Sequence, residues 1–167
     1  MNPKSPALSP VLFLPHGGGP LPILGDKGHE KMVSFLKEIT SELGEPAAIL
    51  VISAHWEEEQ ATITSNSHPE IIYDYYGFPA EAYTIQYAAP GNPGLAKEIH
   101  ALLTASGIPA KLDEQRGFDH GLFVPLKLIC IQKRKFPVFN YRYSRIWIRE
   151  SISLLEKRLH RCERKIF

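Results

Sequence analysis

The sequence predicts an α/β layered fold, because strand-like apolar runs alternate with helix-like segments along the chain. Its 167 residues are 44% hydrophobic and 22% charged, which is typical of one globular domain with its own core. No apolar run approaches the ~20 residues that a membrane-spanning helix needs. The chain also opens on no recognisable secretion signal. We therefore expect a cytoplasmic protein with no membrane partner.

The expected strands are short and apolar. Val11–Leu14 is predicted as a buried strand that ends at the turn of Pro15 and His16. The continuous apolar run in residues 47–56 is typical of a strand buried on both faces of a parallel sheet. A third strand is expected at residues 61–65, which are rich in β-branched side chains.

Three helices are expected along the same chain. Residues 28–43 have helical periodicity, with an apolar face formed by Met32, Val33, Leu36, Ile39 and Leu43. Gly44 then gives the usual stop signal. Residues 92–107 begin on an asparagine cap followed by proline and end at a glycine, so they also predict a helix. Residues 121–129 are compatible with a short third helix that has Pro125 in its first turn.

Two histidines directly follow strand-like runs, His16 after "VLFLP" and His55 after "ILVISA". In open α/β sheets, binding sites form where strands end at their C-terminal edges. Neutral imidazole is the commonest metal ligand among side chains, and the glycines after His16 let the backbone approach an ion or substrate closely. The pattern predicts that both histidines converge on one metal. The alternative is that His16 caps a turn and His55 makes a hydrogen bond in the core.

A third histidine of interest, His120, lies between Gly117 and Gly121 in a predicted loop. An imidazole with a pKa of ~6.5 would suit proton transfer beside a metal centre, although a solvent-facing loop histidine is the plainer alternative. The aromatic segment Tyr73–Pro79 could line an aromatic substrate pocket, or belong to core and turn. The histidines interpreted as structural are His29, His68 and His100.

Four motifs together resemble the class III extradiol ring-cleavage dioxygenases, and in particular the 4,5-DOPA extradiol dioxygenase branch. They are "LPHGGGP", "VISAHWEE", "YDYYGFPAEAYTIQYAAPGNPGLAKEI" and "RGFDHGLFVPLKL", which lie in this order within residues 10–128. The resemblance implies a three-layer α/β fold with a central, mostly parallel sheet and a non-haem metal. The implied reaction inserts both atoms of O2 into a catechol such as DOPA, next to the two hydroxyls.

The resemblance also implies roles for three histidines. His16 and His55 match metal-ligand histidines of the family, and His120 matches an active-site histidine that acts in acid–base steps. Fe(II) is the expected cofactor and Zn(II) is the alternative. Iron sites for oxygen activation leave open positions for substrate and O2, and metal binding depresses the pKa of a bound hydroxyl.

The composition changes sharply after Leu128. Residues 1–128 carry 8 Lys or Arg and 15 Asp or Glu, whereas residues 129–167 carry 11 and 3 and contain no Gly, Ala, Asp or Thr. Family members usually continue further and draw their remaining ligands from that part. We therefore expect residues 1–128 to be the N-terminal part of the dioxygenase domain. We expect residues 129–167 to be a non-native tail produced by a frame change near Ile129, with impaired activity as the result.

Other functions are compatible with parts of the sequence. The basic tail carries Tyr141, Tyr143 and Trp147 and could bind nucleic acid, while residues 146–164 could form a basic amphipathic helix for a membrane or partner. A frame change accounts for the same charges, so we expect neither nucleic acid nor membrane binding. The whole chain could also be a non-catalytic scaffold or a metal-dependent hydrolase. The expected partners are a small-molecule catechol and O2, and the oligomeric state is left open.

Overall fold

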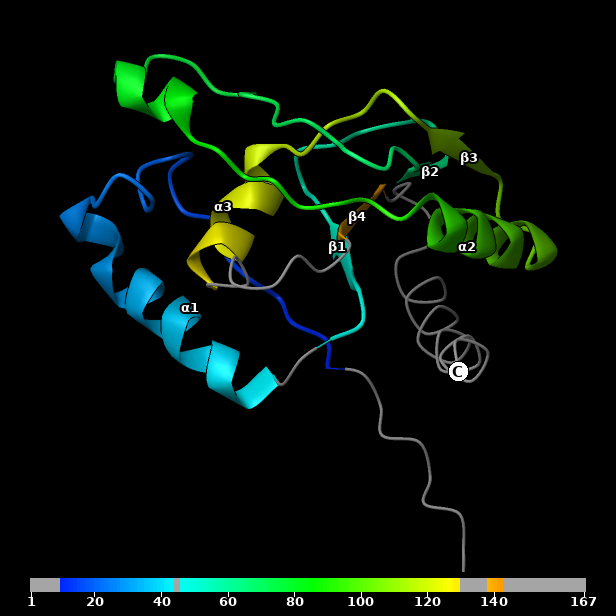
Figure 1. Cartoon of the computed structure of the whole chain (residues 1–167), viewed down its shortest axis with the longest axis horizontal. Helices are drawn as coiled ribbons and strands as arrows, with labels where there is room; N and C mark the ends of the chain where they lie inside the picture. Colours follow the sequence, from blue (N-terminus) through cyan, green and yellow to red (C-terminus); the bar gives the residue numbers. More distant parts are fainter. Residues whose placement is uncertain (1–9, 44–45, 130–137, 143–167) are drawn as a thin grey trace, which may run out of the picture.

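A computed structural model describes residues 10–43, 46–129 and 138–142 of the chain (Figure 1). The elements in chain order are the 3-10 helix η1 (Lys27–His29), α1 (Glu30–Leu43), β1 (Ile49–Ile52), β2 (Ala61–Thr64), the 3-10 helix η2 (Ala80–Thr84), α2 (Pro93–Ala105), β3 (Ala110–Asp113), α3 (His120–Leu128) and β4 (Val138–Arg142). The α/β class predicted from the sequence is confirmed.

The four strands form one sheet in the order β1-β4-β2-β3. β1 pairs with β4 and β2 pairs with β3 in parallel, whereas β2 and β4 are antiparallel. The sheet is therefore mixed, with parallel pairs in the majority. β3 and β4 are strands that the sequence analysis did not predict, and β4 belongs to the basic tail that begins at Ile129.

Two apolar clusters pack against the sheet. The first gathers α3 and Leu36 of α1, and the second gathers α2 with residues of β2 and β3. Ile49 and Val51 of β1 pack against the first cluster and Leu50 against the second, the alternation expected of a strand. Figure 1 shows α1 and α3 on one side of β1 and α2 on the other. Ile52 at the end of β1 is 41% exposed, so the run is less buried than predicted.

The strand predicted at Val11–Leu14 was wrong. The segment has no regular structure, and Val11, Leu12 and Phe13 are exposed. A short apolar run becomes a strand by pairing with a neighbour and burying alternate side chains. No strand in the described part of the chain pairs with these residues. Only Leu14 packs against the first cluster, at the point where the chain turns toward His16.

The helix predictions at 28–43 and 92–107 are confirmed. In α1 the predicted apolar face is the buried one, with Leu36 fully buried and Met32 packed against the first cluster. Gly44, the predicted stop, lies outside the described residues. α2 begins as predicted, because the Asn92 side chain accepts a hydrogen bond from the Leu95 amide at 3.1 Å.

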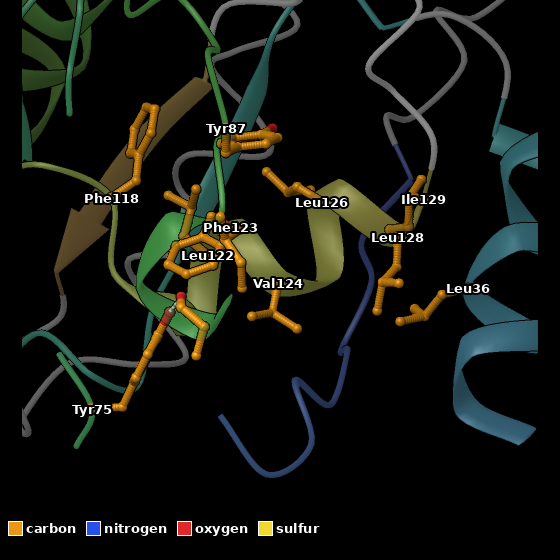
Figure 2. Packing of buried hydrophobic residues seen from close by; sticks show 12 residues of the cluster. Leu36, Tyr75, Tyr87, Phe118, Leu122, Phe123, Val124, Leu126, Leu128 and Ile129 are labelled. Atoms are coloured by element: carbon orange, nitrogen blue, oxygen red, sulfur yellow. Dashed lines mark hydrogen bonds between the residues drawn. The ribbon is translucent and has the colours of Figure 1, made fainter. Parts of the chain in front are cut away.

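The short helix α3 forms the centre of the first cluster (Figure 2). Leu122, Phe123 and Val124 are fully buried and lie between the aromatic residues of the cluster and Leu36 of α1. The predicted helix is confirmed, although Pro125 lies in its second turn and not its first. Because α3 is buried almost throughout, its N-terminal residue His120 is held in a fixed place relative to the sheet.

Candidate metal centre

The structure brings His16, His55 and His120 together. The Nε2 atoms of His16 and His55 are 2.9 Å apart. The His120 ring centroid lies 4.0 Å from that of His55 and 4.9 Å from that of His16. One nitrogen from each ring lies within 4.8 Å of the other two. The convergence expected of His16 and His55 is therefore present, and His120 joins them.

His16 is positioned by a glycine loop that η1 holds in place. Gly17 has a φ of +76°, and a Cβ at this position would meet Cδ2 of His29 at 2.7 Å, so glycine is required there. The Gly18 amide donates to Nε2 of His29 at 3.0 Å. Nδ1 of His29 in turn donates to Oδ2 of Asp26 at 2.6 Å. His29 is thus structural, as predicted, and its role is to clamp the loop that carries His16.

His55 lies just beyond the C-terminal end of β1, against the start of α3. Its amide donates to Oγ of Ser53 at 3.2 Å, and that hydroxyl donates to Oδ1 of Asp119 at 2.6 Å. A Cβ on Gly121 would meet both Cδ2 of His55 and Oγ of Ser53 at 2.7 Å. The glycine therefore lets the helix approach the strand end closely enough to bring His55 and His120 into contact.

The buried side chain of Asp119 connects the end of β1 with the start of α3. Its carboxylate is fully buried and caps α3 by accepting from the Leu122 amide at 3.1 Å. Nη2 of Arg116 lies 3.2 Å from its Oδ2, and the Arg116 guanidinium also lies over the Trp56 ring, 5.2 Å from its centroid. A buried carboxylate with an ion pair and several donors is a stable arrangement. Although Asp119 is adjacent to His120 in sequence, its carboxylate is turned toward Ser53.

His120 is the most buried of the three histidines and the first residue of α3. Oδ1 of Asp74 accepts from both its amide and its Nδ1, each at 2.9 Å. The Tyr75 ring meets the His120 ring edge to face, with centroids 5.7 Å apart. One loop therefore supplies a carboxylate and an aromatic contact to the same imidazole.

The environment favours neutral imidazoles at the two predicted ligands. Burial lowers the pKa of His16, and the nearby rings of His55 and His120 lower it further. His55 is exposed on one side, but the partial desolvation of its ring still lowers its pKa, and the nearby His120 ring lowers it further. Burial alone would raise the pKa of Asp74, but the hydrogen bonds from His120 outweigh it and hold that pKa below its ordinary value. The neutral form of histidine is the one that coordinates a metal.

Within the aromatic segment Tyr73–Pro79, Tyr75 is buried and packs against His120. The hydroxyl of Tyr73 donates to the Ile85 carbonyl at 2.8 Å, and that of Tyr75 donates to the Ala82 carbonyl at 2.6 Å. Burial raises the pKa of Tyr75 to about 12. With their hydroxyls bound to backbone in this way, both rings act as core and turn residues, which was one of the two interpretations of this segment.

Sequence reasoning missed the residues that orient the histidines. Asp74 was passed over inside an aromatic run, and Ser53 inside an apolar one. A single carboxylate among four aromatic residues is the signal that would have pointed to Asp74. Nothing local pointed to Ser53, whose partner Asp119 is distant in sequence.

The geometry fits a metal ion bound by imidazoles. Metal–nitrogen bonds of ~2.0–2.1 Å place neighbouring ligand nitrogens about 3 Å apart. The 2.9 Å between the Nε2 atoms of His16 and His55 matches that spacing. His55 is exposed whereas His120 is buried, so the cluster is open on one side to a small molecule. Imidazole nitrogens suit iron and zinc alike.

No helix within the described ranges is long and apolar enough to cross a membrane.

Residues 10–144 match the family of the catalytic LigB subunit of aromatic ring-opening dioxygenases. The chain therefore belongs to this family. The match continues past Leu128 and includes β4, whereas residues 130–137 and 143–167 lie outside the described part. That the tail is non-native stays a prediction.

The chain is similar to several dioxygenases of known name. It is 44% identical over 130 residues to the dioxygenase tasH of Hapsidospora irregularis, covering 73% of this chain and 40% of that protein. It is 48% identical over 86 residues to a 4,5-DOPA dioxygenase extradiol of Portulaca grandiflora, covering 51% of this chain and 32% of that protein. The chain thus spans well under half the length of these two relatives.

A solved structure supports the fold. The crystal structure of an uncharacterized protein from Escherichia coli K12 superposes with a TM-score of 0.50 at 29% identity. The superposition covers 66% of this chain and 39% of the other.

Proposed function

We propose that this chain carries the metal-binding part of an extradiol dioxygenase that cleaves a catechol such as DOPA with O2. Fe(II) is the proposed metal, and Zn(II) is the alternative. The observation that carries the proposal is the cluster of three histidine nitrogens within 4.8 Å of one another, in a chain of the ring-opening dioxygenase family. The names of its relatives support the choice of DOPA as a substrate.

In this proposal His16 and His55 hold the metal. Their Nε2 atoms face each other, and burial favours the neutral rings that coordination needs. When bound, the metal supplies Lewis-acid activation of the catechol hydroxyls and a place for O2. The glycine at position 17 lets the loop that carries His16 pack closely against the His29 and Pro22 side chains, which fixes where His16 lies.

His120 acts in proton transfer in the same proposal. Its Nδ1 is bound to Asp74, so Nε2 is the atom available to take a proton from a catechol hydroxyl. In the net reaction the ring bond beside one hydroxyl carbon breaks. One oxygen atom ends on each of the two separated carbons, which leaves an aldehyde and a carboxylate. His120 would return its proton to the ring-opened product.

Isotopically labelled O2 tests the proposal. The chain, loaded with Fe(II) and given DOPA, should consume labelled O2 and yield a ring-opened product that contains both labelled atoms. The double variant His16→Ala/His55→Ala should lose Fe(II) binding and this product, whereas His68→Ala, which removes a surface histidine bonded to Ser67, should lose neither. Ester or amide hydrolysis without O2 uptake would contradict the proposal and favour a metal-dependent hydrolase.

A further inference from the structure

We propose that Asp74 is a positioning residue that fixes both the orientation and the tautomer of His120, leaving Nε2 as the unprotonated nitrogen of a ring that packs against His16 and His55. The inference rests on the proposed function in that His120 is its proton-transferring residue. The inference is based on the hydrogen bonds between Asp74 and His120, which lie 46 positions apart in the sequence.

One oxygen of the Asp74 carboxylate accepts two hydrogen bonds from His120. Oδ1 accepts from the His120 amide and from Nδ1 of its ring, each at 2.9 Å. The first amides of a helix have no partner within the helix, so the bond to the His120 amide ties Asp74 to the start of α3. A carboxylate fixed to the backbone in this way holds the ring of the same residue with little freedom.

The hydrogen bond to the ring dictates the tautomer. An ionised carboxylate only accepts hydrogen bonds, so Nδ1 of His120 must carry the proton. In the neutral ring the lone pair is then on Nε2, the nitrogen that the bond to Asp74 leaves free. A carboxylate behind a histidine fixes the tautomer and the orientation of the ring.

The surroundings restrict the alternative orientations of the ring. The His120 side chain is only 8% exposed, and the Tyr75 ring packs against it edge to face. The buried carboxylate of Asp119, which is adjacent to His120 in sequence, accepts from Ser53 and Leu122 and pairs with Arg116. Asp74 accepts the hydrogen bond from the His120 ring that the structure shows.

Nitrogen NMR of the whole chain tests the inference directly. Histidine labelled with ¹⁵N reports in long-range proton–nitrogen spectra which ring nitrogen carries the proton. The chelator-treated protein is studied at about pH 8, above the ordinary imidazole pKa. We expect protonated Nδ1 and unprotonated Nε2 at His120. Asp74→Asn keeps an acceptor oxygen and should keep this tautomer, whereas Asp74→Ala should shift His120 toward protonated Nε2.

Three outcomes decide the inference. Protonated Nε2 at His120 in the unmodified chain overturns it even if no variant folds, and so does an unchanged tautomer in Asp74→Ala. Asp26→Ala, which removes the corresponding carboxylate from His29, is the matched control and should leave the His120 tautomer as it is. The spectra need neither metal nor substrate, so they stand even if the dioxygenase proposal fails.

Kinetics add a second measurement. Loss of a carboxylate that orients a metal-ligating histidine typically costs 10–100-fold in metal affinity or activity, and we expect the same range for the orienting carboxylate of His120. With DOPA we expect Asp74→Ala to lower kcat by a factor in that range while KM changes much less, and Asp74→Asn to recover part of the loss. An unchanged kcat in Asp74→Ala would overturn the positioning role. Absence of O2 uptake by the unmodified chain would count against the proposed function, and the spectra would still decide the inference.

Discussion

At the scale of single residues, Gly121 decides how closely α3 approaches the end of β1. We expect Gly121→Ala to destabilise the fold by about 1–3 kcal/mol, the usual cost of forcing a group into packed space. The new Cβ would meet His55 and Ser53 at 2.7 Å, so His55 must move away from its partners. Zinc affinity should fall with it. Urea unfolding and zinc titration measure the two effects.

Gly94→Ala is the control for that substitution. Gly94 lies in the first turn of α2, where a Cβ would meet only the Asn92 side chain, at 3.3 Å. Alanine is a better helix former than glycine by up to about 1 kcal/mol, so this variant should be as stable as the original or more so. Unchanged zinc affinity in Gly121→Ala would show that the close approach of α3 is not needed for the site.

The lowered pKa values of His16 and His55 make stability depend on pH. Both rings bind protons less tightly in the folded chain than in the unfolded chain, where the ordinary value of 6.5 applies. The free energy of unfolding should be highest above that value and fall as the pH drops through it, because the unfolded state then takes up more protons. Urea unfolding of the chelator-treated chain between about pH 7.5 and 5 checks this.

A double variant isolates the contribution of these two histidines. His16→Gln/His55→Gln removes both titrating rings, so its stability should change less with pH over the same window. The lowered pKa of Asp74 acts in a separate range, since its stabilising effect is lost only below the ordinary carboxyl value of 3.8. Equal pH slopes for the original chain and the double variant would contradict the lowered pKa values.

Single residues of the site differ in how far the sequence reveals them. His16 follows an apolar run and precedes three glycines, and His55 follows another apolar run just before polar residues begin. The local pattern was therefore enough to identify both. Asp74 and Ser53 act through partners far along the chain, on α3 and its cap. Such contacts depend on how elements pack, which no local pattern encodes.

At the scale of elements, η1 acts as a brace for the glycine loop. We expect His29→Ala to cost about 1 kcal/mol of stability, the typical net value of a hydrogen bond. It should also weaken zinc binding, because the Gly18 amide loses its acceptor and the loop that carries His16 loosens. His68→Ala removes a histidine that bonds to its neighbour Ser67 and should change neither quantity. Equal zinc affinity in the two variants would rule out the brace.

The elements that sequence predicted well are those with their own local signals. α1 has an apolar helical face, and α2 has an asparagine cap and a terminal glycine, so both were found. Val11–Leu14 has the composition of a strand but no partner in the described sheet. β3 has only four residues, one of them Lys111, and its strand character comes from pairing with β2. Strand identity is decided by neighbours, whereas a capped helix is largely decided by its own residues.

At the scale of the whole molecule, the site lies where the first cluster meets one strand of the sheet. α3 is buried among residues of that cluster, and β1 packs against both clusters. His120 is thereby positioned by the buried helix α3 and His55 by the packed strand β1. His16 is positioned by the glycine loop that His29 holds. This explains why the three rings converge even though the chain spans well under half the length of tasH and the Portulaca grandiflora relative.

The last prediction concerns activity of the 167-residue chain. We expect it to turn over DOPA much more slowly than a version whose reading frame is changed near Ile129 and continued to the length of its relatives. In our proposal only His16 and His55 hold the metal within the described residues, and each ligand that a site lacks costs binding free energy. A loosely held ion would also leave the catechol without a single orientation, on which ring opening depends. Side-by-side O2 uptake with Fe(II) and DOPA, together with zinc titration of both proteins, measures the difference. Comparable turnover and affinity would mean that the described histidines suffice, and that His120 serves as a third ligand and not as the proton carrier.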